Sequence, residues 1–142
     1  MKYLLLILTV FIFTGCGTAN TTPASNQSPI AIKSKAHGYA EYYSDDELNI
    51  LKKSGNRFAV FVGANWCPGC KRLAGQIIAN QQMLPKNTSI LIADFDAELE
   101  LRRTYGVTVK HTGIFFDTDG THKKTIPGVL MNDFMAHLSN TS

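Results

Sequence analysis

Residues 57–73 read RFAVFVGANWCPGCKRL and join a strand to a helix. The run 57–63 is short, rich in β-branched and aromatic residues and apolar at consecutive positions, which is typical of a central strand covered on both faces. Pro68 suits the first turn of a helix, where its missing N–H costs no hydrogen bond. We therefore expect Cys67 at a helix N-terminus, with Cys70 one turn further on the same face and within disulfide reach.

The pair of Cys67 and Cys70 allows three interpretations. A structural zinc site needs four Cys or His ligands, usually as two pairs, and the sequence has no second C-x-x-C and no H-x-x-x-H. A disulfide across a two-residue gap removes little loop entropy, so it would stabilise the fold little. The helix dipole, with Lys71 and Arg72, favours the thiolate of Cys67, the species that attacks disulfides. We favour a redox pair in which Cys67 attacks and Cys70 resolves, and the metal site and the inert staple stay open.

The N-terminus indicates export. One basic residue is followed by an uncharged apolar run to Phe13 and then by small residues, so we assign residues 1–15 to a secretory signal. FTGC at 13–16 resembles the bacterial lipobox, in which cleavage before Cys16 leaves that cysteine as a lipidated N-terminus, although Phe13 replaces the usual leucine. With Cys16 carrying lipid, the other two cysteines remain as an even pair.

Composition divides the mature chain into a tether and one domain. Residues 16–37 are rich in Thr, Ser, Asn, Ala and Pro, so we expect a flexible tether that holds the domain near a membrane. Residues 38–142 are enough for one domain with a single core, which we expect to be monomeric. The whole sequence has a net charge of +3, and without Lys2 of the signal the mature chain has +2. This charge is mild and dispersed, which argues against a nucleic-acid partner.

Helices and strands alternate along the domain. Ser44 and Glu47 form a capping box for a helix that ends near Gly55, whose left-handed conformation would close it. The helix from Cys67 is expected to reach Leu84. Further elements are expected at 88–95 (strand), 97–106 (helix), 113–117 and 122–126 (hairpin) and 129–138 (helix). The expected inward-facing residues of the second and last helices are Leu73, Ile77, Ile78, Leu84, Leu130, Phe134 and Leu138. This order predicts a three-layer α/β fold with a central mixed sheet of about four strands.

FVGANWCPGCKRL (61–73) resembles the strand–W-C-x-x-C–helix active site of thioredoxin-fold thiol–disulfide oxidoreductases. ADFDAELELRRTYGVTVKHTGIFFDTDGT (93–121) is similar to the strand–helix–Tyr-Gly-Val–loop–hairpin segment of the same family. The resemblance covers roughly residues 40–138 and implies a thioredoxin-like fold. It also implies that Trp66, Pro68, Gly69 and the loop around His111 shape the active site beside Cys67 and Cys70.

His111 is the first departure from the family. Aligning Tyr105-Gly106-Val107 and Phe115-Phe116 without a gap puts His111 where most members have a cis-proline. A cis bond before a non-proline residue costs about 3–4 kcal/mol, so we expect the bond before His111 to be trans or strained. An imidazole there would hold a thiolate, shuttle protons or complete a Cys67–Cys70–His111 site for a soft metal. A one-residue shift of the alignment would instead expose His111 in a longer loop.

Phe61 is the second departure. Reducing thioredoxins resemble one another in burying an Asp beneath the cysteines, and Phe61 occupies that position here. The proton of Cys70 must then pass to water or to His111.

These features predict a lipid-anchored thiol–disulfide oxidoreductase of the bacterial cell envelope, with its domain in the periplasm or extracytoplasmic space. Its partners would be thiols or disulfides of exported proteins and a membrane or periplasmic electron partner. No organic cofactor is implied, since the Cys67–Cys70 disulfide itself carries the electrons. The alternative is a module that binds Cu(I) or Zn(II) through Cys67, Cys70 and His111 without turnover.

Overall fold

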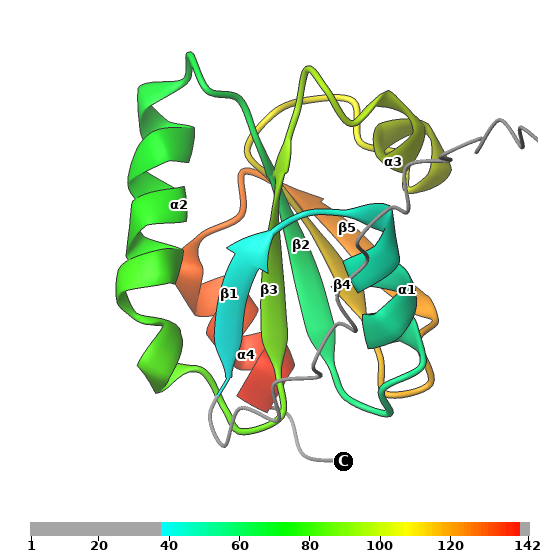
Figure 1. Ribbon diagram of the computed structural model, residues 1–142. Coiled ribbons are helices and arrows are strands. Elements are labelled where there is room, and N and C mark those ends of the chain that lie inside the picture. The colour runs from blue at the N-terminus through cyan, green and yellow to red at the C-terminus, as the bar shows by residue number, and fades with distance from the viewer. Residues whose placement is uncertain (1–37, 140–142) are drawn as a thin grey trace, which may run out of the picture. The chain divides into compact units, whose positions relative to one another are not determined.

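The computed structural model describes residues 38–139. The expected signal at 1–15, the lipidation site Cys16 and the tether at 16–37 lie outside the described residues. The elements are, in chain order, β1 (Tyr39–Tyr42), α1 (Asp45–Lys52), β2 (Phe58–Gly63), α2 (Pro68–Ala79), the 3₁₀ turn η1 (Gln81–Met83), β3 (Ser89–Asp94), α3 (Leu99–Thr104), β4 (Thr112–Phe116), β5 (His122–Pro127) and α4 (Met131–Ser139) (Figure 1). Between residues 38 and 139, none of the helices combines the length and the apolarity that crossing a membrane requires.

The five strands form one mixed sheet in the order β1-β3-β2-β4-β5. The first three run parallel, whereas β4 is antiparallel to β2 and to β5. In β2 all six residues are buried, as expected of a central strand that is covered on both faces. The carboxyl ends of β2 and β3 and the beginning of β4 therefore lie together at one end of the sheet.

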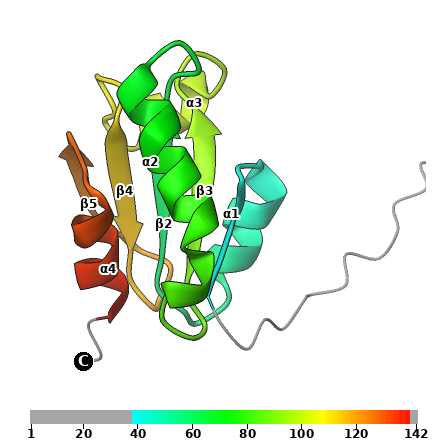
Figure 2. The ribbon, with the colours of Figure 1, turned by 90° about the vertical axis from the view of Figure 1, so that its left-hand side faces the viewer.

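Helices cover both faces of the sheet, with α2 and α4 on one face and α1 and α3 on the other (Figure 2). Alternate residues of β2, β3 and β4 supply the two cores. The core under α2 and α4 contains Phe61, Phe115, Leu73, Ile77, Phe134 and Leu138. The core under α1 and α3 contains Phe58, Val60, Phe116, Leu48, Leu51 and Leu101. The expected three-layer α/β arrangement is confirmed.

Three local expectations are wrong. The sheet has a fifth strand, β1, which the sequence analysis missed. The second helix ends at Ala79 rather than at Leu84, because the chain tightens into the turn η1 after Asn80. Ile78 and Leu130 were expected to face the core but are 39% and 61% exposed.

The first helix begins as expected and ends a little earlier. The hydroxyl of Ser44 caps α1 by accepting a hydrogen bond of 3.2 Å from the Glu47 amide. Gly55 has the expected left-handed φ of 73°, but it lies two residues beyond Lys53, which caps the helix.

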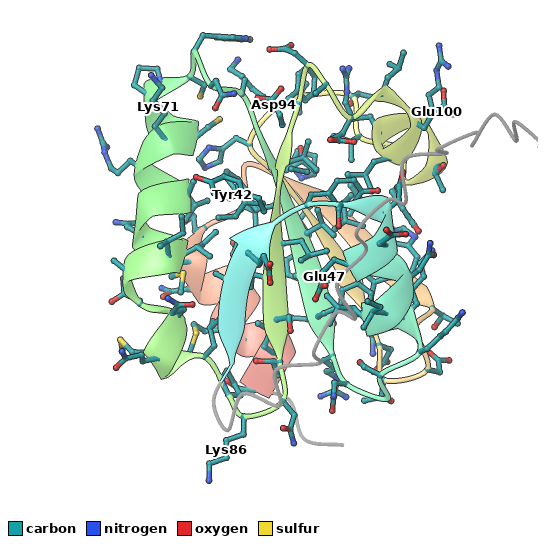
Figure 3. All side chains as sticks on the ribbon, in the orientation of Figure 1. Tyr42, Glu47, Lys71, Lys86, Asp94 and Glu100 are labelled. Carbon is teal, nitrogen blue, oxygen red and sulfur yellow. The ribbon has the colours of Figure 1, made fainter. Side chains whose placement is uncertain are left out.

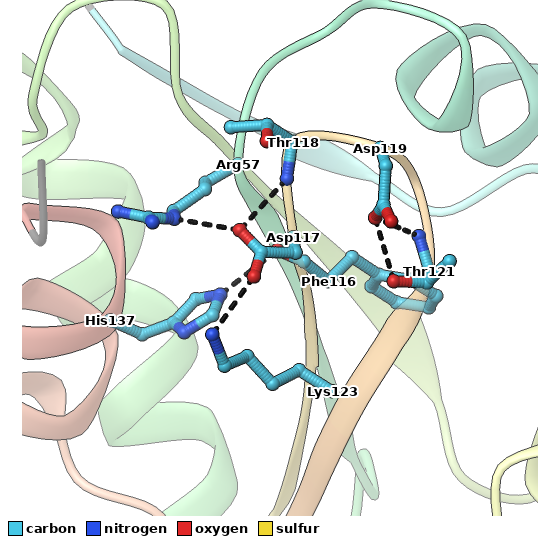
Figure 4. A network of polar contacts seen from close by, with 8 residues as sticks. All are labelled: Arg57, Phe116, Asp117, Thr118, Asp119, Thr121, Lys123 and His137. Carbon is cyan, nitrogen blue, oxygen red and sulfur yellow. Dashed lines mark hydrogen bonds and ion pairs between the residues drawn. The ribbon is translucent and has the colours of Figure 1, made fainter. Parts of the chain in front are cut away.

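The two ends of the sheet carry different polar groups. The side chains of Lys71 and Asp94 lie at the end where β2 hands over to α2, and Lys86 lies at the opposite end (Figure 3). At that opposite end Asp117 binds Arg57 at 3.1 Å and Lys123 at 2.8 Å, which ties the start of β2 to the β4–β5 hairpin (Figure 4). The first end contains Cys67 and Cys70, the residues that the sequence assigns to the site.

Candidate active site

Cys67 occupies the N-cap of α2, immediately after the loop that follows β2. Its backbone is extended, with φ −91° and ψ 112°, and Pro68 begins the helix as expected. The backbone amide of Cys70 donates a hydrogen bond of 3.3 Å to the sulfur of Cys67. The sulfur thus takes the place that a Ser or Asp oxygen takes in an ordinary N-cap, and receives the unpaired amides of the first turn.

The two sulfurs differ in burial and in acidity. Cys67 is half-buried, whereas Cys70 is 2% exposed and packs into the core under α2. Hydrogen bonds from the side chain and backbone of Cys70 lower the pKa of Cys67, with a smaller contribution from the charge of Lys110. Burial raises the pKa of Cys70, and its side-chain hydrogen bond to Cys67 raises it further. Of the two sulfurs, Cys67 is therefore the more readily ionised, and Cys70 keeps its proton more firmly.

Lys110 is a site residue that the sequence analysis missed. The largest charge contribution to the acidity of Cys67 comes from Lys110, not from Lys71 or Arg72, whose side chains are exposed on α2. The Lys110 ammonium lies 4.6 Å from the centroid of the Trp66 ring. The sequence contains a signal for this role, because Lys110 immediately precedes His111, which the family alignment places opposite the cysteines.

Trp66 lies at the surface beside the pair and is held by polar contacts. It is 62% exposed, and its indole N–H donates a hydrogen bond of 2.8 Å to Asp96. The neighbouring Asn65 donates to Asp94, whose carboxylate also accepts from the backbone amides that follow it. The loop before Cys67 is therefore anchored to the end of β3, with the tryptophan ring facing solvent.

The structure brings His111 to the cysteines. The nitrogen of its ring and the sulfurs of Cys67 and Cys70 all lie within 4.8 Å of one another. The ring is edge-on to Phe61, with the centroids 5.5 Å apart and an interplanar angle of 86°. The described residues contain no cis peptide bond, and His111 adopts a left-handed φ of 63°. Of the two expectations, a trans or a strained bond, the trans bond is observed; the left-handed φ was not expected. The imidazole faces the sulfurs rather than lying exposed in a longer loop.

Phe61 is fully buried beneath the pair. As expected from the sequence, an aromatic ring and not a carboxylate occupies this position. Gly63 provides the space for this arrangement. A Cβ on Gly63 would lie 2.8 Å from the Phe61 ring and 3.2 Å from the Cβ of Cys70. The environment of Cys70 is thus aromatic and apolar, which is the physical cause of its raised pKa.

A cleft of about 410 Å³ runs alongside the cysteine loop, between α2 and the start of α4. Its lining residues include Gly69, Arg72, His111, Leu130 and Met131. Exposed apolar side chains lie around the site, namely Trp66, Val109 and Leu130, at 62%, 48% and 61%.

Of the residues that the sequence analysis assigned to the site, the structure brings together Trp66, Cys67, Pro68, Gly69, Cys70 and His111. Cys16 lies outside the described residues. The arrangement offers a nucleophilic sulfur, a second sulfur within disulfide reach, and an imidazole beside both. Cys67, Cys70 and His111 are also the residues that could hold a metal ion.

Comparisons with known proteins agree with this geometry. A family model described as a thioredoxin-like domain matches residues 44–141. The solved structure of Trxlp from Edwardsiella tarda is 23% identical with a TM-score of 0.61, and the match covers 71% of this chain and 99% of that chain. The thioredoxins of Malassezia sympodialis and Schistosoma mansoni are 17% and 18% identical, each with a TM-score of 0.58; each match covers 72% of this chain, and 93% and 94% of those chains. Comparison with curated protein sequences gives no match. The structural matches confirm the thioredoxin-like fold, and because the family model spans most of the sequence, the chain belongs to the thioredoxin-like domain family.

Proposed function

We propose that this protein is a thiol–disulfide oxidoreductase that acts on cysteines of exported proteins, anchored to a bacterial membrane by lipid on Cys16. The observation that carries the proposal is the difference between the two sulfurs. Cys67 is half-buried at a helix N-terminus and accepts the Cys70 amide, whereas Cys70 is buried behind it. An inert staple needs no such difference, but a nucleophile and a resolving thiol do.

The reducing direction proceeds in two exchanges. The Cys67 thiolate attacks a substrate disulfide, so that a mixed disulfide forms and one substrate sulfur leaves as a thiolate. Cys70 then loses its proton and attacks the sulfur of Cys67, which releases the second substrate sulfur and closes the Cys67–Cys70 disulfide. Two electrons pass to the substrate, and the oxidising direction is the reverse of these steps.

The proton of Cys70 leaves to water or to His111, because Phe61 fills the place below the pair with an aromatic ring. The exposed apolar side chains near the cysteines, Trp66 and Val109, and Leu130 in the lining of the cleft, support a protein or peptide substrate. The secretory signal and the lipobox-like FTGC support the envelope as the place of action.

The test of the proposal is a redox titration of the Cys67/Cys70 pair against glutathione buffers. We expect one reversible two-electron transition. A midpoint of about −270 mV identifies a reductase, and a midpoint of about −120 mV identifies an oxidase. A pair that stays in one state across the whole range contradicts the proposal.

The anchor has a separate test, fractionation of a Cys16→Ala variant. The variant should lose lipid and remain either soluble or uncleaved. If it fractionates with membranes at the processed mass of the parent, the lipid anchor is contradicted, while the redox assignment of Cys67 and Cys70 is untouched.

A further inference from the structure

We infer that the reduced pair of Cys67 and Cys70 binds one Cu(I) ion together with His111. The three donor atoms lie within 4.8 Å of one another, and they come from two separate parts of the chain that the fold brings together. Thiol–disulfide exchange needs only the two sulfurs. The imidazole is the additional group that makes this a three-donor site.

The spacing of the donors is close to what one ion needs. Bonds of about 2.3 Å to sulfur and about 2.0 Å to nitrogen place the donors on a common ion about 3.5–4 Å apart. Closing the site from the observed spacing requires a movement of about 1 Å. Cys67 is half-buried at the end of a helix, so its sulfur has the freedom to make that movement.

His111 is held toward the sulfurs by its surroundings. Its left-handed φ of 63° is unfavourable for a residue with a side chain and persists only where neighbouring contacts maintain it. Its carbonyl accepts hydrogen bonds from Gly128 at 2.8 Å and from Val129 at 3.2 Å. On the other side its ring packs edge-on against Phe61. The backbone and the ring are both fixed, so the nitrogen is in place before an ion arrives.

The chemistry of the donors selects a soft ion, and the charge of the site favours a monovalent one. Thiolate sulfur selects Cu(I) and Zn(II), and imidazole binds both. A structural zinc ion takes four protein ligands, whereas this group offers three. With two thiolates the Cu(I) complex carries a charge of −1 and the Zn(II) complex none. The nearby ammonium of Lys110, which lies over the adjacent Trp66 ring, therefore favours the copper complex.

The redox state of the pair controls this site. Binding displaces the proton of the Cys70 thiol and any proton that Cys67 carries, and the copper stays Cu(I) throughout. In the disulfide form neither sulfur is a thiolate, so only the reduced protein binds. A loaded site in turn leaves no free nucleophile at Cys67, so metal binding and disulfide exchange exclude one another.

The experiment titrates Cu(I) into the full-length chain carrying Cys16→Ala, so that Cys67 and Cys70 hold its only thiols. The protein is reduced with a phosphine, freed of reductant under argon, and titrated against the chromophoric chelator bicinchoninate. We expect one Cu(I) per chain in the reduced form and none in the disulfide form. His111→Ala should weaken binding by more than about tenfold. The matched control is His122→Ala, an exposed histidine on β5, which should bind as the parent does.

X-ray absorption of the loaded parent gives a readout that needs no variant, and should show two sulfur ligands and one nitrogen. A shell of sulfur alone overturns the proposal, as does unchanged affinity in a His111→Ala variant that is folded by circular dichroism. Zn(II) that displaces Cu(I) at equal concentration overturns the choice of ion. The glutathione titration is run on metal-free protein, so its result stands independently of these outcomes.

Discussion

The backbone amide of Cys70 donates a hydrogen bond of 3.3 Å to the sulfur of Cys67. The residue that would resolve a mixed disulfide therefore also stabilises the thiolate that forms it. Because the bond belongs to the first turn of α2, it exists only when the helix is folded. This stabilisation of the thiolate therefore depends on the folded first turn of α2.

Alkylation should distinguish the two thiols. Hydrogen bonds from Cys70 lower the pKa of Cys67, and burial raises that of Cys70, so at pH 7 Cys67 should react faster with iodoacetamide. The rate for Cys67 should reach half its maximum at a lower pH than the rate for Cys70. Tandem mass spectrometry of the reduced protein measures both. Equal rates in the folded protein would contradict the assignment, whereas equal rates in urea are expected.

Lys110 should contribute to this difference, and Lys71 offers a matched control. Lys110→Gln removes the charge that helps to lower the pKa of Cys67, so alkylation at neutral pH should slow. Lys71→Gln, on the exposed face of α2, should change the rate less. The effect of Lys110→Gln should shrink as ionic strength rises, because salt screens exposed charges. A larger effect from Lys71→Gln would refute the role given to Lys110.

Replacing either of two glycines, Gly63 beside Cys70 or Gly75 inside α2, by alanine should change the free energy of unfolding, in opposite directions. At Gly63 a Cβ would meet the Phe61 ring at 2.8 Å, so Gly63→Ala should lower the free energy of unfolding by about 1–3 kcal/mol. At Gly75, inside α2, a Cβ meets nothing within 4 Å, so Gly75→Ala should raise it by about 0.5–1 kcal/mol. Urea denaturation measures both changes. A Gly63→Ala variant as stable as the parent would show that Phe61 and Cys70 are not packed as described.

His137 should make stability depend on pH. Burial lowers its pKa below the ordinary 6.5, although its ring bonds the Phe116 carbonyl at 2.9 Å (Figure 4). As pH falls, His137 is therefore protonated at a higher pH in the unfolded chain than in the folded protein. Stability from this group is complete above pH 6.5 and is lost as pH falls from there toward the lower folded value, at up to about 1.4 kcal/mol per pH unit.

The test of this pH dependence compares the parent with His137→Gln by urea denaturation at pH 7.5 and pH 5.5. The parent should lose more free energy of unfolding than the variant over that interval. Other groups titrate equally in both proteins, so the difference isolates His137. Identical losses in the two proteins would show that His137 carries no such linkage.

The central part of the fold could be predicted from the sequence because its signals are local. Consecutive apolar residues in β2, Pro68 at the start of a helix and the Ser44 cap each act within a few positions. The strand β1 was missed because it is only four residues long, pairs on one side alone and leaves Tyr42 73% exposed. An edge strand of this kind has neither the apolar run of a central strand nor a clear alternation.

The site was predictable as far as the family alignment reached. It placed His111 opposite the cysteines, where the structure has it. The role of Lys110 does not show in the spacing around the cysteines, because Lys110 lies 43 positions from Cys67 in the sequence. Only its place next to His111 in the family alignment points to it. The left-handed φ of His111 was equally hidden, because it follows from how the loop joins β4 and the turn at Gly128.

The central claim, that Cys67 attacks and Cys70 resolves, is tested most directly by trapping mixed disulfides in cells that export the full chain. Cys70→Ser removes the resolving thiol and leaves the half-buried nucleophile Cys67, so it should accumulate adducts with envelope proteins that dithiothreitol releases. Mass spectrometry should find Cys67 in every cross-link. The matched variant Cys67→Ser keeps only the buried thiol and should trap nothing. Adducts from Cys67→Ser, or none from Cys70→Ser, would contradict the account.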